Sequence, residues 1–374
     1  MNRIILIGNG FDLAHGLKTK YTDFIEHFWE NEKENVVTGI VNKIPQYIPY
    51  TNTQADAYVY EDNIVKIISP CKIADLLKRI NTSKKGYDWF KELSDSRYKI
   101  NINGVDVFLK VEFKNTFLET ISKKSHLQKW VDIEEEYYLT LYERLNDNKK
   151  GGITELNNDF LVVQNALEEY LTMQTNEFFE ISQRIQKNIY SKTILSEFDT
   201  IRGEPPFNIL IVNFNYTSTI NQYFKVIRRG ITPEIINIHG KLNTPDNPII
   251  FGYGDEIGDR YKVIESRNDN RYLENIKSIK YLETDNYKNL LAFMDSDEFE
   301  IFIMGLSCGV SDRTLLNTMF EHKHCVLIKI FYHKREDGTD DFRDVVMNIS
   351  RNFTDKAGMR KKVIEKQNSM PLTL

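Results

Sequence analysis

The stretch Ile4-Ile5-Leu6-Ile7-Gly8-Asn9-Gly10-Phe11-Asp12 lies at the start of the chain and decides its fold. Its four apolar residues predict a buried strand. Two glycines one residue apart end this strand, and a helical pattern begins near Thr22. Strand, glycine turn and helix is an arrangement that holds a phosphate or a ribose, because glycine leaves backbone N–H groups open to a ligand. A plain tight turn is the alternative, since Leu13 stands where the dinucleotide fingerprint has its third glycine.

The composition is that of a globular protein. Of the 374 residues, 41% are hydrophobic and 12% aromatic, which is enough for a packed core and excludes global disorder. The formal net charge of −5 gives no general attraction to nucleic acid or to an anionic membrane.

Cysteines and apolar runs indicate the compartment. Cys71, Cys308 and Cys325 form no C-x-x-C pair, so we expect no structural zinc and a reducing environment. Four apolar residues before Gly8 are too few for a signal peptide, and no apolar run approaches the length of a membrane span. We therefore expect a soluble cytoplasmic protein. The acidic run Glu134–Glu136 suits the first turn of a helix; a metal site is the alternative, but no histidine stands at ligand spacing.

Further buried strands are predicted in the second half of the chain. They cover 208–212, 235–238, 249–251, 300–304 and 325–331. These runs are continuous rather than alternating, as is typical of strands buried on both faces. Helical patterns separate several of them, so we predict an α/β fold with a parallel sheet and helices on both faces.

The domain organisation follows from these strands. We expect a discontinuous nucleotide-binding core of residues 1–29 and 201–335, interrupted by a mostly helical insertion at 30–200. Within the insertion, alternating segments on both sides of Asn103-Gly104 predict a β-hairpin near 98–111. Residues 336–374 are expected to form a C-terminal helical segment.

Polar residues follow several of the predicted strands. Asn213 and Asn215 come after 208–212, and His239-Gly240 after 235–238. In a parallel sheet the carboxyl ends of the strands lie at one edge, where ligands bind, so we expect Asn215 and His239 to meet over Gly8-Asn9-Gly10. His239 is a candidate general base, and a structural histidine is the alternative. Ser307 lies in Gly-Leu-Ser-Cys-Gly, which superficially matches the hydrolase elbow G-x-S-x-G.

Motifs along most of the chain resemble the AbiH family of bacteriophage abortive-infection proteins. They are I-G-N-G-F-D-L-A-H-G-L at the start, W-x-D-I-E, N-F-N-Y-T, I-H-G, F-G-Y-G and M-G-L-S. The resemblance runs from the first strand to about residue 330. It implies a phage-defence effector that harms its own host cell on infection.

The AbiH family is in turn similar to the sirtuin-like superfamily, whose defence members often hydrolyse NAD. The resemblance implies a Rossmann-like (sirtuin-like) fold, with Asn215 as the catalytic asparagine and His239 as the catalytic histidine. The resemblance also implies Gly305, Ser307 and Asp312 as a ribose-binding segment and Gly8 and Gly10 as a phosphate loop. We expect five neighbouring residues to bind the cofactor as well: Asn9, Phe11, Asp12, Asn213 and Gly240. Two positions depart from the superfamily's motifs: Thr217 replaces the aspartate of T-N-Y-D, and Asn9–Asp12 replaces the G-A-G-x-S loop.

Two functions remain open at this point. One is an enzyme that binds NAD or a related nucleotide as its substrate and hydrolyses the N-glycosidic bond without a metal. The other is a nucleotide-binding sensor or interaction protein of a phage-defence system, without turnover. A phage-derived trigger or a homo-oligomer would suit either function.

Overall fold

The computed structural model describes residues 1–42, 46–49, 56–69, 73–95, 99–102, 105–128, 132–145, 152–175, 179–192, 205–224 and 231–373. The chain forms two compact units. The first, here called the sheet unit, comprises Met1–Lys20, Tyr137–Ile153 and Leu171–Leu374; the second unit comprises Tyr21–Glu136 and Thr154–Tyr170. Residues 137–153 and 171–192, which the sequence analysis assigned to an insertion, belong to the sheet unit.

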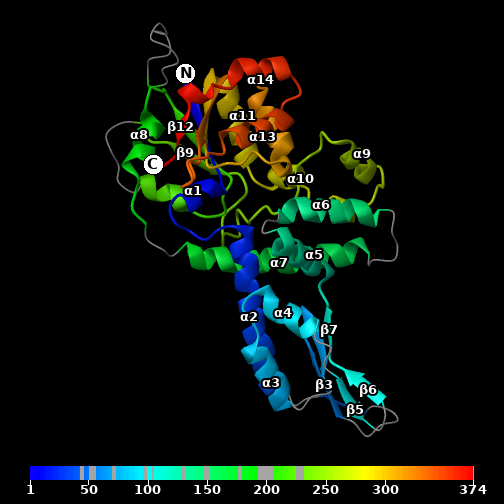
Figure 1. The fold of residues 1–374 in the computed structure, drawn as a ribbon. Coiled ribbons are helices and arrows are strands. Elements are labelled where there is room, and N and C mark those ends of the chain that lie inside the picture. The colour runs from blue at the N-terminus through cyan, green and yellow to red at the C-terminus, as the bar shows by residue number, and fades with distance from the viewer. Residues whose placement is uncertain are drawn as a thin grey trace. The chain divides into compact units, whose positions relative to one another are not determined.

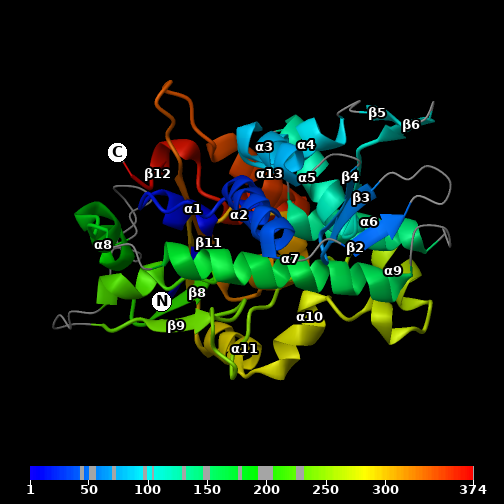
Figure 2. The same ribbon diagram turned by 90° about the horizontal axis from the view of Figure 1, so that it is seen from below.

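A six-stranded parallel sheet organises the sheet unit (Figure 1). Its strands are β1 (Asn2–Ile7), β8 (Ile209–Asn213), β9 (Glu234–Asn237), β10 (Phe299–Met304), β11 (Cys325–Tyr332) and β12 (Met370–Pro371). They lie in the order β12-β11-β10-β1-β8-β9, and Figure 2 shows β11, β8 and β9 in succession across the sheet. The predicted parallel sheet is therefore confirmed.

The chain leaves β1 in two directions. It first adds β8 and β9 on one side of β1, and then returns to add β10, β11 and β12 on the other side. The strand order thus reverses between β1 and β10, whose carboxyl ends are adjacent because Ile7 pairs with Met304.

One strand prediction was wrong. Residues 249–251 pair with no strand, although Ile250 and Phe251 are buried. Ile250 donates its N–H to the carbonyl of His239 at 2.8 Å and packs into the core of the sheet unit. The apolar run therefore reflects burial of an irregular segment between Pro248 and Gly252.

Helices cover both faces of the sheet, because successive side chains of each strand point to opposite faces. Ile4 and Leu6 of β1 belong to a core formed with α11 (Asn286–Ser296), α12 (Arg313–Phe320) and α13 (Phe342–Asn352). Ile5 and Ile7 belong to a second core formed with α1 (Asn9–Leu13), α8 (Gln183–Tyr190) and the 3₁₀ helix η1 (Thr219–Phe224). Figure 1 shows α11 and α13 on one side of the strands and α1 and α8 on the other.

A buried ion pair links the two central strands near their amino ends. Arg3 of β1 lies 2.7 Å from Glu300 of β10, its partner in register. The Arg3 guanidinium also donates to the carbonyls of Ile189 and Ser191 at the end of α8, at 2.7 and 2.6 Å. Arginine thus satisfies helix carbonyls that would otherwise be unpaired, and this cluster has a structural role far along the strands from their carboxyl ends.

The sheet unit contains further short elements. They are α9 (Asp259–Glu265), η2 (Asn270–Tyr272), α10 (Lys277–Lys280), η3 (Tyr281–Glu283), η4 (Val310–Asp312), α14 (Lys356–Lys362) and η5 (Lys366–Asn368). Of these, α10, η3 and η4 carry side chains that reach the candidate site described below. Beyond residue 335 the chain is largely helical, and it ends in β12, which pairs with β11.

The second unit contains an antiparallel sheet that the sequence analysis did not predict. Its strands β2 (Gln46–Pro49), β3 (Asp56–Glu61), β4 (Val65–Ser69) and β7 (Lys110–Phe113) lie in that order. A separate pair, β5 (Lys99–Ile102) and β6 (Val105–Phe108), occupies the segment predicted as a hairpin; its turn, 103–104, lies outside the described residues.

Helices and aromatic side chains complete the second unit. The helices are α2 (Tyr21–Asn42), α3 (Ile73–Thr82), α4 (Tyr87–Ser94) and α5 (Thr116–Gln128), with parts of α6 (Ile133–Arg144) and α7 (Ile153–Gln174). Trp29 lies at the centre: its indole donates to Ser122, and its carbonyl accepts from the indole of Trp89. At the start of α6, Asp132 accepts the N–H groups of Glu134 and Glu135, as a helix-capping residue does. Within the described ranges, no helix combines the length and the apolar character that crossing a bilayer requires.

Candidate functional site

Buried polar side chains gather where β1, β8, β9 and β10 end. Asp12, Asn213, Asn215, His239 and Asp312 are all at least nine-tenths buried at this edge. Burying polar groups opposes folding unless they are paired, so a set of them at one edge of a sheet indicates a site rather than a core. The side chains divide into two clusters, one around Asp12 and one around Asp312.

The glycines pack against one another at the switch point of the sheet. A Cβ at Gly8 would lie 2.5 Å from Leu306 Cα, and one at Gly10 would lie 2.8 Å from the carbonyl oxygen of Gly305. Gly305 has φ +76°, and a Cβ there would lie 2.1 Å from the Phe11 nitrogen. The segment expected to be a glycine turn is in fact the start of α1, with Gly8 as its N-cap. The glycines therefore allow the ends of β1 and β10 to approach closely.

The Asp12 cluster contains a carboxyl group without a cation. Asp12 is 1% exposed, and its Oδ2 accepts a hydrogen bond from the Thr217 hydroxyl at 2.6 Å. Its Oδ1 has no hydrogen-bond partner among the described residues. Burial raises the pKa of Asp12 to about 6, although Thr217, Thr219 and Asn215 lie near enough to lower it.

Asn215 connects this cluster to the first strand. Its side-chain amide donates to the carbonyl of Gly8 at 3.0 Å, and its backbone N–H donates to Asn213 Oδ1 at 3.1 Å. The amide of Asn213 in turn donates to Asn237 Oδ1 and to the Thr217 carbonyl. These bonds fix the loop after β8, so the position of Asn215 is set by Gly8, directly after β1, and by Asn213, the last residue of β8.

His239 belongs to the other cluster. Its Nδ1 lies 3.1 Å from the carbonyl of Phe214, and because a carbonyl only accepts, Nδ1 carries a proton. Its Nε2 lies 3.1 Å from both the Tyr281 hydroxyl and Asp312 Oδ1. Burial lowers the pKa of His239, and the charge of Lys277 lowers it further. In the neutral ring, Nε2 then accepts from the Tyr281 hydroxyl.

Lys277 holds the second carboxylate. It is fully buried at the start of α10, and its Nζ lies 2.8 Å from Asp312 Oδ1. Burial alone would raise the pKa of Asp312, but Lys277 and His239 outweigh burial and hold that pKa below its ordinary value. Asp312 is therefore a paired carboxylate, in contrast to Asp12.

The sequence analysis missed Lys277 and Tyr281. Both come from the segment between β9 and β10, where no strand end marks a site, and neither stands in a glycine-containing motif. A lysine that lies between Ile276 and Ser278 is the only local signal, and lysines in such places are ordinarily exposed.

The remaining predicted residues lie at the rim or in the backbone of this edge. Asn9 is exposed, and its side chain bonds to Thr19. Phe11 packs under the sheet in the second core. Gly240 has φ +79°, and a Cβ there would lie 1.9 Å from the Pro248 carbonyl oxygen. Ser307 is exposed, and its carbonyl accepts from Asn348.

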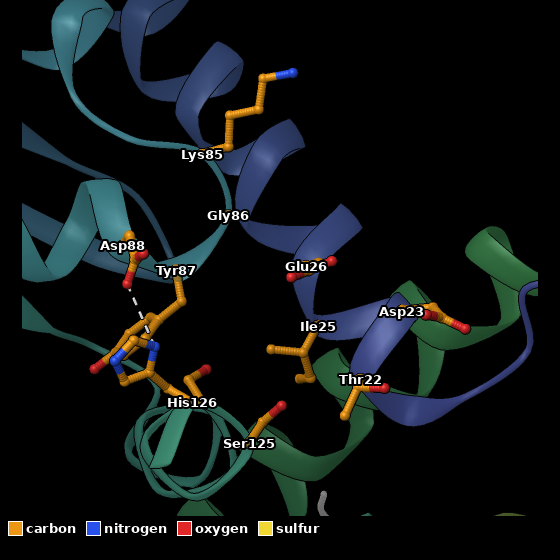
Figure 3. Close-up of a pocket in the computed structure, with 11 residues that line it drawn as sticks. Thr22, Asp23, Ile25, Glu26, Lys85, Gly86, Tyr87, Asp88, Ser125 and His126 are labelled. Carbon is orange, nitrogen blue, oxygen red and sulfur yellow. Dashed lines mark ion pairs between the residues drawn. The ribbon is translucent and has the colours of Figure 1, made fainter. Parts of the chain in front are cut away.

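The second unit contains cavities of its own. A cavity of 260 Å³ is lined by α2, by α5 and by the start of α4 with the two residues before it, and His126 lies 3.3 Å from Asp88 (Figure 3). A second cavity, of 540 Å³, shares Tyr87 and His126 with the first. Figure 3 shows Asp23, Glu26 and Asp88 with Lys85 and His126 around the first cavity. Because these charges are of both signs, they indicate no single class of ligand.

Within the described ranges, no three histidine, cysteine or acidic side chains are grouped closely enough to hold a metal ion.

Comparison with known proteins identifies the family. No curated protein and no solved structure matches the chain. The model of one protein family, described as bacteriophage abortive infection AbiH, matches residues 4–333. Since this match covers most of the 374 residues, the chain belongs to the AbiH family of bacteriophage abortive-infection proteins.

Proposed function

We propose that the chain is an abortive-infection effector that binds NAD or a related nucleotide and hydrolyses its N-glycosidic bond. Family membership connects the chain with abortive infection. The proposal for the nucleotide rests on one observation. Two buried carboxyl groups lie at the carboxyl edge of a parallel sheet, and the pKa of Asp12 is raised whereas that of Asp312 is lowered. Perturbed carboxyl groups of this kind cluster at functional sites.

The strand order supports a dinucleotide as the ligand. Counted along the chain, the six strands lie in the order 6-5-4-1-2-3, the order of the doubly wound sheets that bind dinucleotides. Ligands of such sheets lie beyond the carboxyl ends of the strands at the switch point. In this chain that point lies between β1 and β10, beside Gly8, Gly305 and Asp12. The strand order therefore supports a Rossmann-like fold, and the relation to the sirtuin-like enzymes that we propose rests on the motif resemblance alone.

The chemistry of the site suits a reaction in which positive charge develops on the sugar as a neutral leaving group departs. Cleavage of NAD breaks the bond between the ribose C1′ and the nicotinamide nitrogen and leaves an oxocarbenium-like sugar. We propose Asn215 and His239 as catalytic residues: Asn215 places a ribose hydroxyl or a water. His239 takes a proton from a ribose hydroxyl once the Tyr281 hydroxyl is displaced from Nε2. Neither a metal nor a covalent nucleophile takes part.

A sensor without turnover is the second candidate. It is favoured by one observation, namely that both ring nitrogens of His239 already have partners within the protein. In that case the edge of the sheet would bind a nucleotide and pass the signal to a partner, such as a phage component or a second copy of the chain.

The test is to express the chain in bacteria, infect them with a phage against which it protects, and follow NAD and nicotinamide. Purified protein is incubated in parallel with NAD and an extract of infected cells, which supplies any trigger. We expect nicotinamide to appear as NAD disappears, and Asn215→Ala and His239→Ala to slow this by about 10²–10⁴-fold. Protection of infected cells with unchanged NAD would refute the proposal, and NAD binding without nicotinamide release would favour the sensor.

A further inference from the structure

Asp12 is a buried carboxyl group, and one of its two oxygen atoms accepts no hydrogen bond from the described residues. Its Oδ2 is held by the Thr217 hydroxyl, and its Oδ1 lies in the protein without a hydrogen-bond partner among the described residues. An unpaired buried carboxylate oxygen destabilises the fold. Such an atom is retained where a ligand or a water completes it, so Asp12 needs an explanation that the fold alone does not give.

Among the residues that the structure describes, only neutral groups interact with the Asp12 carboxyl group. His15 follows the helix of Asp12, and its ring nitrogens bond to the Phe11 carbonyl and to the Tyr223 hydroxyl of η1. Burial lowers the pKa of His15, so its ring is neutral. Asn215 and Thr217 of the loop after β8 and Thr219 at the start of η1 present neutral groups to Asp12. The carboxyl group therefore changes its charge without disrupting an ion pair.

We propose that Asp12 is a catalytic residue whose unpaired Oδ1 accepts the proton of the water that attacks the sugar. This inference rests on the proposed nucleotide hydrolysis and adds to it the residue that activates the water. Asp12 suits this role because His239 Nε2, once the Tyr281 hydroxyl is displaced, takes the proton of a ribose hydroxyl, which leaves the attacking water in need of a second base.

The step balances as follows. The bond between C1′ and the nicotinamide nitrogen breaks, and its electron pair neutralises the pyridinium ring. The water oxygen forms a bond to C1′, and one of its protons moves to the Asp12 carboxylate. The products are nicotinamide and the ribose hydroxyl compound, and Asp12 then releases the proton to solvent.

Ionisation of Asp12 sets the pH dependence of this step. Burial raises the pKa of Asp12 to about 6, so the base is present above that pH and lost below it. A general base with a pKa near the working pH is also the most effective one. We therefore expect kcat/KM for NAD to rise with pH through about 6 and then to level off.

The experiment compares pH profiles of nicotinamide release from NAD for the 374-residue chain and two variants, in the extract of infected cells. Asp12→Asn should slow the reaction by about 10²–10⁴-fold and remove the limb near pH 6. Asp259→Asn is the matched control, because that aspartate is fully exposed and lies on α9; it should leave the profile unchanged. Thermal unfolding of each protein is measured to check that the variants are folded.

Each outcome decides something different. An Asp12→Asn protein that keeps its rate within tenfold, or keeps the limb near pH 6, overturns the role of Asp12 but leaves nucleotide hydrolysis standing. A wild-type chain that protects cells and releases no nicotinamide at any pH overturns both.

Discussion

Asp12 and Asp312 are two buried carboxyl groups at one edge of the same sheet, and they differ in the presence of a cation. Lys277 lies 2.8 Å from Asp312 and keeps the pKa of that group low. Asp12 receives only neutral donors, and burial raises its pKa to about 6. Two neighbouring carboxyl groups whose pKa values are shifted in opposite directions are typical of sites where the two groups have different roles in proton transfer. The comparison therefore predicts that changing the Asp312 pair lowers the stability of the fold, whereas neutralising Asp12 raises it.

The largest effect is expected from Lys277→Met. Removing the cation leaves Asp312 buried without a full charge partner, which typically lowers the free energy of unfolding by about 3–5 kcal/mol. Lys280→Met is the control, because Lys280 lies three residues along the same short helix, is half-buried, and donates to a neutral side chain, Asn275 Oδ1, at 3.0 Å. Urea unfolding at pH 7 measures both. The double variant Lys277→Met/Asp312→Asn should recover much of the loss, and a single variant as stable as the control would contradict the pairing.

Asp12→Asn should have the opposite effect to Lys277→Met, because it should raise the free energy of unfolding. The pKa of Asp12 is 3.8 in the unfolded chain and about 6 in the folded one, so the folded protein binds a proton more tightly. Stability therefore falls as pH rises from about 4 to 6, and above that the ionised carboxylate destabilises the fold by about 3 kcal/mol. The variant should be more stable than wild type at pH 8 by up to this amount and equal to it at pH 4. Denaturant unfolding at the two pH values checks this; equal stability at pH 8 would show that Asp12 is not strained by its charge.

Thr217→Val should produce a smaller loss that depends on pH. The Thr217 hydroxyl donates to Asp12 at 2.6 Å, and a hydrogen bond to a charged group contributes about 1.5–3 kcal/mol. The loss should be present at pH 8, where Asp12 is ionised, and smaller at pH 5, where it is protonated. A loss that does not change between these two pH values would mean that Thr217 acts through packing.

The smallest effect is expected from Tyr281→Phe in the paired cluster. It removes the hydroxyl 3.1 Å from His239 Nε2, a neutral hydrogen bond that contributes about 0.5–1.5 kcal/mol. Because Tyr281 belongs to the Asp312 cluster, the titration of Asp12 should not change. Thermal unfolding measures the first effect and the pH dependence of stability the second; a shifted Asp12 titration would show that the two clusters are coupled.

The parallel sheet could be predicted from the sequence because its strands are continuous apolar runs. Burial on both faces produces such runs, and the polar residues that follow them, Asn215 and His239 among them, mark the carboxyl edge. The same logic failed at 249–251, because an irregular buried segment is as apolar as a strand. Burial can be recognised in a sequence, whereas strand pairing cannot.

The chemistry of the site could be predicted only in part. Asn215 and His239 stand directly after strands, but Lys277 and Tyr281 reach the same edge from a region of short helices that no periodic pattern marks. Asp12 was expected to bind a cofactor, whereas its distinguishing property is an oxygen atom without a partner. That property depends on contacts with Thr217, which is distant in sequence, and so only coordinates reveal it.

The titration of Asp12 itself tests the comparison most directly, because it needs neither a trigger nor a substrate. The chain is labelled with ¹³C at the aspartate carboxyl carbon, and carboxyl shifts are followed between pH 4 and 8 by NMR, with Asp12→Asn and Asp312→Asn spectra to assign the two signals. We expect the Asp12 signal to titrate with a midpoint near 6, and the Asp312 signal to remain that of a carboxylate throughout. An Asp12 signal with a midpoint near the ordinary value of about 4 would contradict the account.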